Sequence, residues 1–289
     1  MSMANLKALA LRIRSVRSIQ KTTRVMQMIS ASKFRIAREG LVCARDYCSA
    51  IAKEDSEHRY LAEAGGASGV LLVVFSSDKG LCGGFNHSVA KFLREYVSSM
   101  ASSSGGERLS FLFVGKKAHE LVGCANVQAF GEVVGVIPQP RGIGFLNFKS
   151  MLYSLGVDFS AYSRVVALYS RFYSSARQEP TAEDVLIVDS AKESTEGREA
   201  STEEVMCNYD PNSSSVRKKL YINSFIGKLY LAMCESLVCE HCSRMVAMES
   251  ANSNTKSMLN RLLLDYNRSR QASITTDLIE IVSGCEALG

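Results

Sequence analysis

The segment with the greatest potential for chemistry runs from Ser76 to Asn86, with the sequence SSDKGLCGGFN. It lies between an apolar run and a helix-forming stretch, where doubly wound folds bind phosphate groups on a helix N-terminus. The segment contains neither the Gly-Lys-Ser/Thr of a Walker motif nor the pattern G-x-G-x-x-G. Cys82 lies close to Lys79, the setting of an activated thiol, but no histidine is evident as its partner. A structural tight turn is the favoured interpretation, and a phosphate site or an activated thiol are the alternatives.

A second cluster consists of Cys234, Cys239, His241 and Cys242. Structural zinc needs four ligands that converge tetrahedrally. On a helix, the offsets of five, seven and eight residues put Cys234 and His241 on one face and Cys239 on another. Small packing residues are therefore favoured over a metal site. We expect no metal ligands and no cofactor site in this chain.

The sequence contains no recognisable motif for acid–base catalysis. The chain has four histidines, which are His58, His87, His119 and His241. None of them is paired with a carboxylate in a recognisable motif. The sequence therefore predicts no catalytic residues. The function is then expected to depend on how the helices and strands are arranged.

The N-terminal segment is predicted to be one long helix from Asn5 to about Tyr60. The only prolines are Pro138, Pro140, Pro180 and Pro211, so nothing interrupts a helix at either end of the chain. Residues at alternating spacings of three and four form the seam of a coiled coil: Leu6, Leu9, Ile13, Val16, Gln20 and Thr23. At about 1.5 Å per residue, the helix would be on the order of 80 Å long.

The C-terminal segment mirrors the first, with a predicted helix from about Val216 to Leu288. A three-four spacing continues at its end through Ile274, Leu278 and Ile281. Small residues at positions 239, 243, 246 and 250 are spaced to admit a close partner helix. We therefore predict that the two terminal helices form an antiparallel coiled coil. The alternative is that each helix packs on a central domain.

The middle of the chain alternates between strand and helix patterns. The predicted strands are Gly69–Phe75, Leu109–Val114, Arg164–Phe172 and Val185–Val188, and the predicted helices are Asn86–Met100, Lys116–Val122 and Leu146–Val157. Such alternation is typical of a mainly parallel sheet with an antiparallel edge, a Rossmann-like α/β domain. Residues 191–204 are predicted to form a surface loop. The expected domains are residues 1–62, 63–212 and 213–289.

The positive charge of the chain is concentrated at its start. Residues 1–38 contain nine basic residues and no acidic one, so the rest of the chain holds 25 basic against 29 acidic residues. Three interpretations stay open on this composition: a nucleic-acid-binding arm, a mitochondrial transit peptide, or a helix that faces an acidic protein. The longest purely apolar run is Val70–Phe75, too short to cross a bilayer. Nine scattered cysteines are typical of a reducing compartment.

Three segments together resemble the γ subunit family of F-type ATP synthases. They are Ser15–Phe34 (SVRSIQKTTRVMQMISASKF), the loop Ser77–Asn86, and the C-terminal SRMVAM at 243–248 with YNRSRQASIT at 266–275. The last segment ends in EIVSG at 280–284. The segments lie near both ends and in the middle, so the resemblance spans the chain.

The resemblance implies a rotor and not an enzyme. In this family the two terminal helices form an antiparallel coiled coil inside a ring of alpha and beta subunits, and the α/β domain lies at the foot against the epsilon subunit and the c-ring. Proton flow turns the ring and the shaft, which drives the beta subunits through their binding states. The nucleotide chemistry belongs to the beta subunits, so the chain itself needs no cofactor.

The resemblance also implies stator contacts at Met26 on the first helix and at Arg244, Arg270, Gln271 and Thr275 on the last. Because it begins at about Met3, the basic start belongs to the mature helix, facing acidic loops of the beta subunits and not nucleic acid. This implies a bacterial protein, peripheral to the plasma (inner) membrane on its cytoplasmic face.

Two other classes of function stay as alternatives. One is a stand-alone nucleotide-binding α/β enzyme that uses the loop from Lys79 to Gly84 and dimerises through its helices. The other is a coiled-coil nucleic-acid-binding protein that uses the basic helix.

Overall fold

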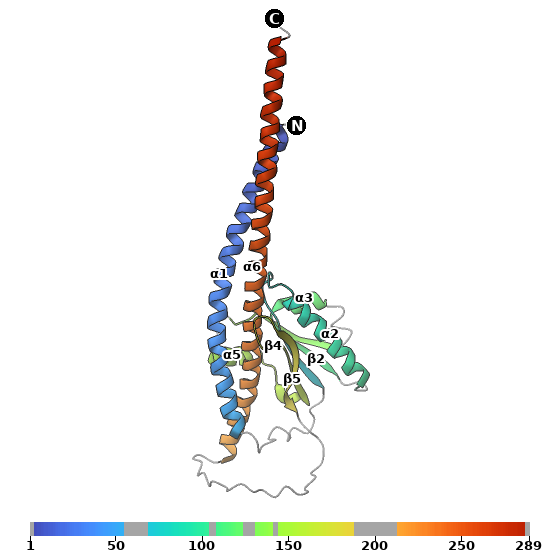
Figure 1. Ribbon diagram of the computed structural model, residues 1–289. Coiled ribbons are helices and arrows are strands. Elements are labelled where there is room, and N and C mark those ends of the chain that lie inside the picture. The colour runs from blue at the N-terminus through green and yellow to red at the C-terminus, as the bar shows by residue number, and fades with distance from the viewer. Residues whose placement is uncertain are drawn as a thin grey trace. The chain divides into compact units, whose positions relative to one another are not determined.

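The computed structural model describes residues 3–54, 69–103, 108–123, 131–140, 144–187 and 213–286 (Figure 1). The elements, in chain order, are α1 (Met3–Glu54), β1 (Val70–Phe75), α2 (Phe85–Ser103), β2 (Leu109–Val114), α3 (Lys116–Val122), β3 (Gly131–Ile137), α5 (Phe145–Ser154), the 3-10 turn η1 (Phe159–Ala161), β4 (Arg164–Phe172), β5 (Gln178–Ile187) and α6 (Ser213–Glu286). The chain divides into two compact units. One, the helix pair, comprises residues 1–32 and 244–289, and the other, the α/β unit, comprises residues 33–243.

The α/β unit is built on one five-stranded sheet with the strand order β3-β2-β1-β4-β5. β1 pairs in parallel with both β2 and β4, and β2 pairs in parallel with β3. β5 runs antiparallel to β4 at the edge. The predicted sheet, mainly parallel with one antiparallel edge, is therefore confirmed.

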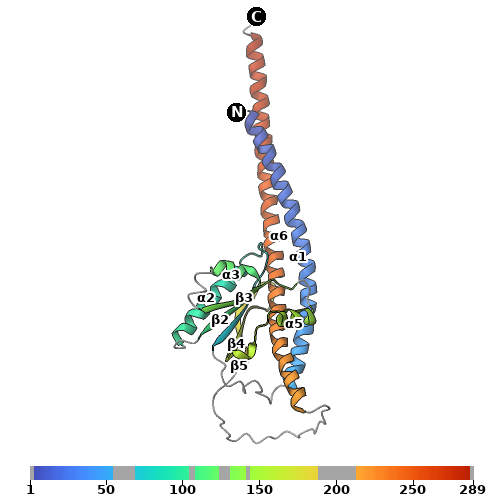
Figure 2. The same ribbon diagram turned by 180° about the vertical axis from the view of Figure 1, so that it is seen from behind.

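Helices cover both faces of this sheet. Every residue of β1 is buried as a result, whichever face its side chain points to. Leu71, Val73 and Phe75 point to one face, where they pack with α5 and with the parts of α1 and α6 that belong to the α/β unit. The alternate residues, such as Leu72, point to the opposite face and pack with α2 and α3 (Figures 1 and 2). The predicted Rossmann-like arrangement is thus present, with the terminal helices supplying part of one layer.

Strand β3 was not predicted, and β5 begins earlier than predicted. Two glycines, Gly131 and Gly135, interrupt the apolar run of β3. A Cβ at Gly131 would lie 2.0 Å from the carbonyl oxygen of Leu109, so only glycine allows β3 this close to β2. The prediction of β5 as Val185–Val188 was too short because the strand begins with polar residues and Pro180, which an edge strand tolerates.

The long helices pack on the sheet as well as on each other within the α/β unit. Ala37 and Leu41 of α1 are buried in the same core cluster as Leu229 of α6. A Cβ added at Gly227 of α6 would lie 3.3 Å from the ring of Tyr47, so the glycine permits a close approach of the two helices. The alternative that each terminal helix packs on the central domain is therefore true of these portions.

The predicted helix ends are matched closely where they can be compared. α6 ends at Glu286, two residues before the predicted end. The predicted continuation of α1 to Tyr60, the loop at 191–204 and the domain boundaries at 62 and 212 lie outside the described residues. Between Lys219 and Glu286, α6 contains a window apolar enough to cross a membrane, but 78% of that window is buried inside the protein, as in a core helix.

Candidate functional site: the helix pair

The helix pair is held by a small apolar seam near the start of α1. Ile13, Val16 and Leu262 are buried there. The residues packed around them are Leu9, Leu259, Leu263 and Tyr266. α1 and α6 run in opposite directions (Figures 1 and 2). The predicted seam at three-four spacing and the antiparallel pairing are therefore confirmed for this part of the chain.

Farther along α1 the seam becomes polar. Gln20 and Thr23 are half-buried, and Ser30 is buried. The hydroxyl groups of Thr23 and Ser30 form hydrogen bonds within α1. Thr23 Oγ1 donates to the carbonyl oxygen of Gln20 at 3.0 Å, and Ser30 Oγ donates to the carbonyl oxygen of Met26 at 2.8 Å. Small, internally bonded side chains let two helices approach closely without a large apolar interface. Most of the apolar contact in this unit thus lies near the N-terminus.

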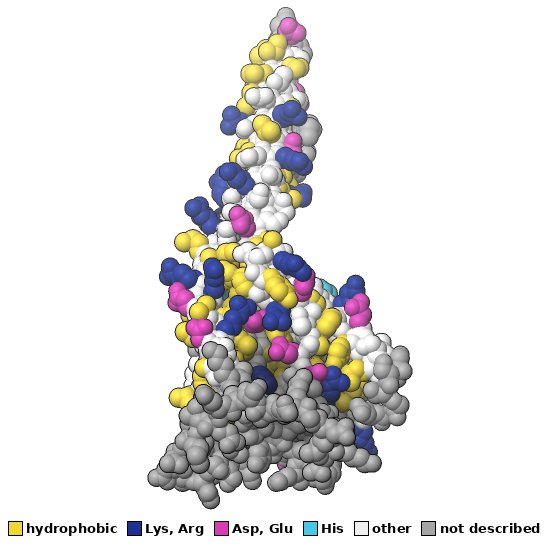
Figure 3. All heavy atoms as spheres, turned by 60° about the horizontal axis from the view of Figure 1, so that its bottom comes forward, with side chains coloured by type: hydrophobic (Ala, Val, Ile, Leu, Met, Phe, Trp, Pro, Cys, Tyr) yellow, Lys and Arg dark blue, Asp and Glu magenta, His cyan; other side chains and the backbone are white. Residues whose placement is uncertain are grey.

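The outer surface of the helix pair is basic and apolar. The unit contains eleven basic and five acidic residues, whereas the α/β unit contains 23 basic and 24 acidic ones. Large hydrophobic side chains are also exposed there, including Leu11, Ile19, Val25, Met28 and Ile29. In Figure 3, Lys and Arg side chains alternate with hydrophobic ones on the face turned to the viewer. Such a surface favours a partner that is acidic and apolar.

The five predicted stator-contact residues all lie in this unit, on both helices. Met26 and Arg244 are half-buried, and Arg270, Gln271 and Thr275 are exposed. Thr275 Oγ1 donates to the backbone carbonyl oxygen of Gln271, one turn earlier on α6, at 3.0 Å.

These residues form two groups at different levels and not one cluster. Since Ile13 packs level with Leu262, Met26 is level with residues close to Glu249, about one turn from Arg244. Arg270 lies 21 residues beyond Glu249, or about 30 Å along the helix axis. The pair could therefore touch a surrounding protein at two separate levels.

The last turns of α6 correct one expectation. Ile274, Leu278 and Ile281 were expected to continue the seam, but they are 49%, 57% and 62% exposed. α1 begins at Met3, and by the antiparallel register its first turn is level with about residue 272 of α6. The apolar residues beyond that level have no helix beside them in the described chain, so the seam prediction was wrong there.

The small residues between 239 and 250 were expected to admit a close partner helix, and the structure shows other contacts for two of them. Cys239 is fully buried and its thiol lies 3.2 Å from the carbonyl oxygen of Ser170 on β4. Ser243 Oγ donates a hydrogen bond to Gln178 Oε1 on β5 at 2.9 Å. Val246 is 48% exposed. Cys239 and Ser243 therefore contact strands β4 and β5 of the sheet, where a partner helix was expected.

The loop from Ser76 to Asn86 is a tight turn whose polar groups are used internally. Asn86 Oδ1 accepts from the backbone N–H of Ser77 at 3.2 Å, and Asn86 Nδ2 donates to Ser77 Oγ at 2.7 Å and to the sulfur of Cys82 at 3.1 Å. Ser77 Oγ donates to the carbonyl oxygen of Lys79 at 2.8 Å. Leu81 has φ 62°, the one described non-glycine residue in the left-handed region. This arrangement supports the tight-turn interpretation over a phosphate cradle.

Asp78 and Gln139 fasten this turn to the neighbouring strands. Asp78 accepts from the backbone N–H groups of Lys116 at 3.3 Å and Gln139 at 2.9 Å. The amide of Gln139 in turn donates to Ser76 O at 2.8 Å and to Glu240 Oε2 at 2.7 Å. The Asp78 carboxylate, which would be needed if this loop were catalytic, is thus engaged in hydrogen bonds that join the ends of β1, β2 and β3.

Three buried cysteines of α6 lie in surroundings that disfavour the reactive thiolate form. Cys234, Cys239 and Cys242 are free thiols and buried. Burial raises the pKa of Cys234 to about 12 and raises the pKa of Cys239 and Cys242 as well. Among the described residues, no group of three or more His, Cys, Asp or Glu side chains is placed to hold a metal ion.

Comparison with known proteins decides the family. The family model described as ATP synthase matches residues 5–288. The chain is 43% identical to the ATP synthase gamma chain of Ehrlichia canis, and the match covers 99% of this chain and all of that protein. A gamma chain from the Wolbachia of Brugia malayi is 36% identical with the same coverage. The chain belongs to the ATP synthase gamma chain family.

Solved structures of ATP synthases contain chains with the same fold. A chain of the Euglena gracilis mitochondrial ATP synthase matches with a TM-score of 0.66 at 15% identity, covering 99% of this chain and 95% of that one. A chain of the Tetrahymena thermophila central stalk and c-ring matches with a TM-score of 0.58 at 20% identity, covering 80% of this chain and 99% of that one. The stand-alone enzyme and the nucleic-acid-binding coiled coil receive no support.

Sequence reasoning missed the apolar row beside Met26. Val25, Met28 and Ile29 are each more than half exposed. The signal was available, because these positions lie opposite the seam of Gln20 and Thr23 and should have been polar on a free helix.

Proposed function

We propose that this chain is the central rotor shaft of an F-type ATP synthase, a non-catalytic subunit that couples rotation of a c-ring to conformational change at the catalytic beta subunits. The observation that carries the proposal is the full-length match at 43% identity to an ATP synthase gamma chain. The polar groups of the loop from Ser76 to Asn86 are engaged in the turn, which agrees with a subunit that performs no nucleotide chemistry.

The surface of the helix pair suits a shaft that must turn inside other subunits. Basic and apolar side chains can be attracted to acidic and apolar walls without a fixed pattern of bonds. Arginine side chains at two levels, Arg244 below and Arg270 above, give the shaft separate charged contacts. We propose that Met26, Arg244, Arg270, Gln271 and Thr275 contact the stator at these levels.

The partners in this proposal are the alpha and beta subunits around the helix pair, and the epsilon subunit and c-ring at the α/β unit. The Euglena and Tetrahymena structures contain F1, rotor, central stalk and c-ring parts. The protein would be peripheral to the membrane, on the cytoplasmic face of a bacterial plasma membrane. Gamma chains from Ehrlichia and Wolbachia support the bacterial assignment.

Reconstitution tests the proposal. Alpha, beta and epsilon subunits from one relative, such as Ehrlichia canis, are combined with this chain and bound to membrane vesicles that hold the matching membrane sector. We expect ATP-driven proton pumping that depends on the chain. The isolated chain should hydrolyse no ATP, and Lys79→Ala should leave pumping unchanged. ATP hydrolysis by the pure chain that is abolished by Lys79→Ala would contradict the proposal. It would favour the alternative of a stand-alone nucleotide-binding α/β enzyme.

A further inference from the structure

The turn between β4 and β5 presents an exposed tyrosine between two arginines. Tyr173 is 53% exposed. The guanidinium of Arg177 lies 5.2 Å from the centre of this ring, and that of Arg171 lies 6.0 Å from it. Both distances are within the range of cation–π attraction. The three side chains therefore support one another on the surface; we call them the Tyr173 patch.

The backbone holds this patch in place. The N–H of Tyr173 donates to the carbonyl oxygen of Arg177 at 3.3 Å, so the two residues face each other across the turn. Arg171 lies two residues before Tyr173 and shares its face of the strand. From α1, the Arg45 guanidinium donates to the carbonyl oxygen of Phe172 at 3.3 Å and adds a third cation beside the patch. A preorganised surface loses less conformational entropy on binding.

The charges of the patch are only partly matched. Arg177 forms an ion pair with Glu179 at 2.8 Å, and Arg45 forms one with the buried Glu235. Arg171 is exposed and has no carboxylate among the described residues within ion-pair distance. Two of the three arginines are therefore matched by carboxylates, and the exposed guanidinium group of Arg171 is the one without such a partner among the described residues.

We propose that the Tyr173 patch is a docking site for an acidic peptide segment of a partner protein. Guanidinium groups bind carboxylates in a planar, bidentate geometry, and tyrosine and arginine are the residue types that dominate binding energy at interfaces. Glu179 pairs with Arg177 at 2.8 Å, and the exposed Glu183 lies four residues farther along β5, so an extended phosphate backbone would meet carboxylates beside the patch. A short segment that carries carboxylates fits it better.

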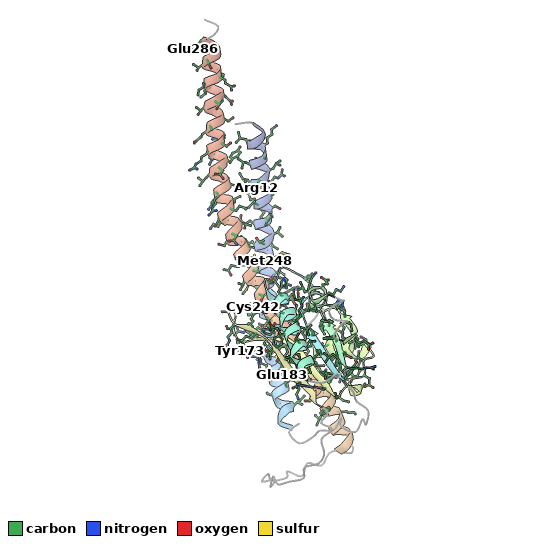
Figure 4. All side chains as sticks on the ribbon, turned by 90° about the vertical axis from the view of Figure 1, so that its right-hand side faces the viewer. Arg12, Tyr173, Glu183, Cys242, Met248 and Glu286 are labelled. Atoms are coloured by element: carbon green, nitrogen blue, oxygen red, sulfur yellow. The ribbon has the colours of Figure 1, made fainter. Side chains whose placement is uncertain are left out.

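This surface lies in the α/β unit and is distinct from the predicted stator contacts, which all lie in the helix pair. Figure 4 shows Tyr173 beside Cys242, whose thiol points to the carbonyl oxygen of Ser175 in the same turn at 3.7 Å. The proposal does not depend on rotor function, because it can be tested on the isolated chain.

The test uses the absence of tryptophan from the sequence. The Tyr173→Trp variant of the full chain places a single indole in the patch. Its fluorescence is titrated with a short peptide built from Asp, Glu and Leu, and with a peptide in which Lys replaces the acids. We expect the acidic peptide alone to shift the emission to the blue, with an affinity that falls as salt is added.

Variants in the same reporter background identify the cations. Arg171→Gln and Arg177→Gln should each weaken binding by about fivefold. Lys91→Gln removes one charge from an exposed ion pair on α2 and should leave the affinity unchanged. Circular dichroism checks that each variant is folded. No binding, equal binding of the lysine peptide, equal loss with Lys91→Gln, or heparin competing better than the acidic peptide would each overturn the proposal.

Discussion

The carboxylate of Glu235 on α6 lies 2.9 Å from a guanidinium nitrogen of Arg45 on α1. Glu235 is almost fully buried, whereas the Arg45 side chain is 47% exposed. The second carboxylate oxygen accepts from the backbone N–H of Phe172 at 3.3 Å, at the end of β4. One buried side chain therefore joins both terminal helices to the sheet within the α/β unit.

Replacing Glu235 should destabilise this unit. Glu235→Ala leaves the N–H of Phe172 without its acceptor and Arg45 without its counter-ion, and hydrogen bonds to charged groups contribute about 1.5–3 kcal/mol each. Because Arg45 can turn to solvent, we expect a loss of about 2–3 kcal/mol in the free energy of unfolding. Urea unfolding of the full chain measures it.

The control for this experiment is Lys91→Gln. It breaks the ion pair between Lys91 and Glu95, which are 79% and 63% exposed and 3.8 Å apart. We expect a change below about 0.5 kcal/mol. Equal unfolding midpoints for the two variants would mean that Glu235 does not join the helices as described.

The helix pair should depend on its apolar seam. Leu262 is 8% exposed and packs with Ile13, so Leu262→Ala should cost about 2–3 kcal/mol locally. Leu264, only two residues away, is 61% exposed, and Leu264→Ala should cost little. Amide hydrogen exchange over residues 3–32 and 244–286 provides the measurement. Exchange should accelerate in the first variant alone, and acceleration in both would place the seam elsewhere.

Alkaline pH should weaken the α/β unit through Cys234. Burial raises the pKa of this thiol from 9.0 to about 12, so the folded chain keeps a proton that the unfolded chain releases. The resulting stability is fully present below about pH 9 and is lost as the pH rises towards 12, at about 1.4 kcal/mol per pH unit for one such thiol. Unfolding titrations at pH 8, 9 and 10 should show a shallower decline for Cys234→Ala; the same slope as in the parent chain would exclude Cys234 as the cause.

Introducing a charge at Met26 should impair coupling. A half-buried methionine can slide past successive subunits, whereas in Met26→Lys an ammonium group can form an ion pair with a stator carboxylate in one rotary state. If that contact adds 1–2 kcal/mol to the barrier, stepping slows about 5- to 30-fold. The complex should still assemble and bind nucleotide.

The readout for Met26→Lys is the ATPase rate together with proton pumping in membrane vesicles. Met28→Lys supplies the same charge on a side chain that is 66% exposed and outside the predicted contacts, so its effect should be smaller. Wild-type ATPase and pumping in Met26→Lys would exclude Met26 from the stator contact.

Much of this fold could be predicted because local patterns and tertiary packing agree. The continuous apolar run of β1 predicted a buried strand, and the spacing of Ile13 and Val16 predicted the helix seam. β3 could not be predicted, since Gly131 and Gly135 are poor strand formers, and the close approach to β2 that explains Gly131 is visible only in the folded sheet.

The candidate site was predicted less completely, because exposure depends on where the partner helix stops. The spacing of Ile274 and Leu278 is the same as that of a buried seam, and nothing local shows that α1 does not reach them. In the same way, the spacing of Cys239 gave no sign that its thiol contacts β4 and not a helix. The motif resemblance named the expected stator-contact residues, but it gave no sign that they divide into two levels along the helix pair.

Single-molecule rotation tests the central claim most directly. Lys91, on α2 of the α/β unit, is 79% exposed, so Lys91→Cys provides an attachment point for a bead when Cys43, Cys124, Cys207 and Cys285 are replaced by serine. The chain is assembled with immobilised alpha and beta subunits, and the bead is followed as ATP is added. We predict sustained rotation in one direction that stops when ATP is removed. A bead that stays fixed, or moves only randomly, while the same complexes hydrolyse ATP at full rate would contradict the rotor.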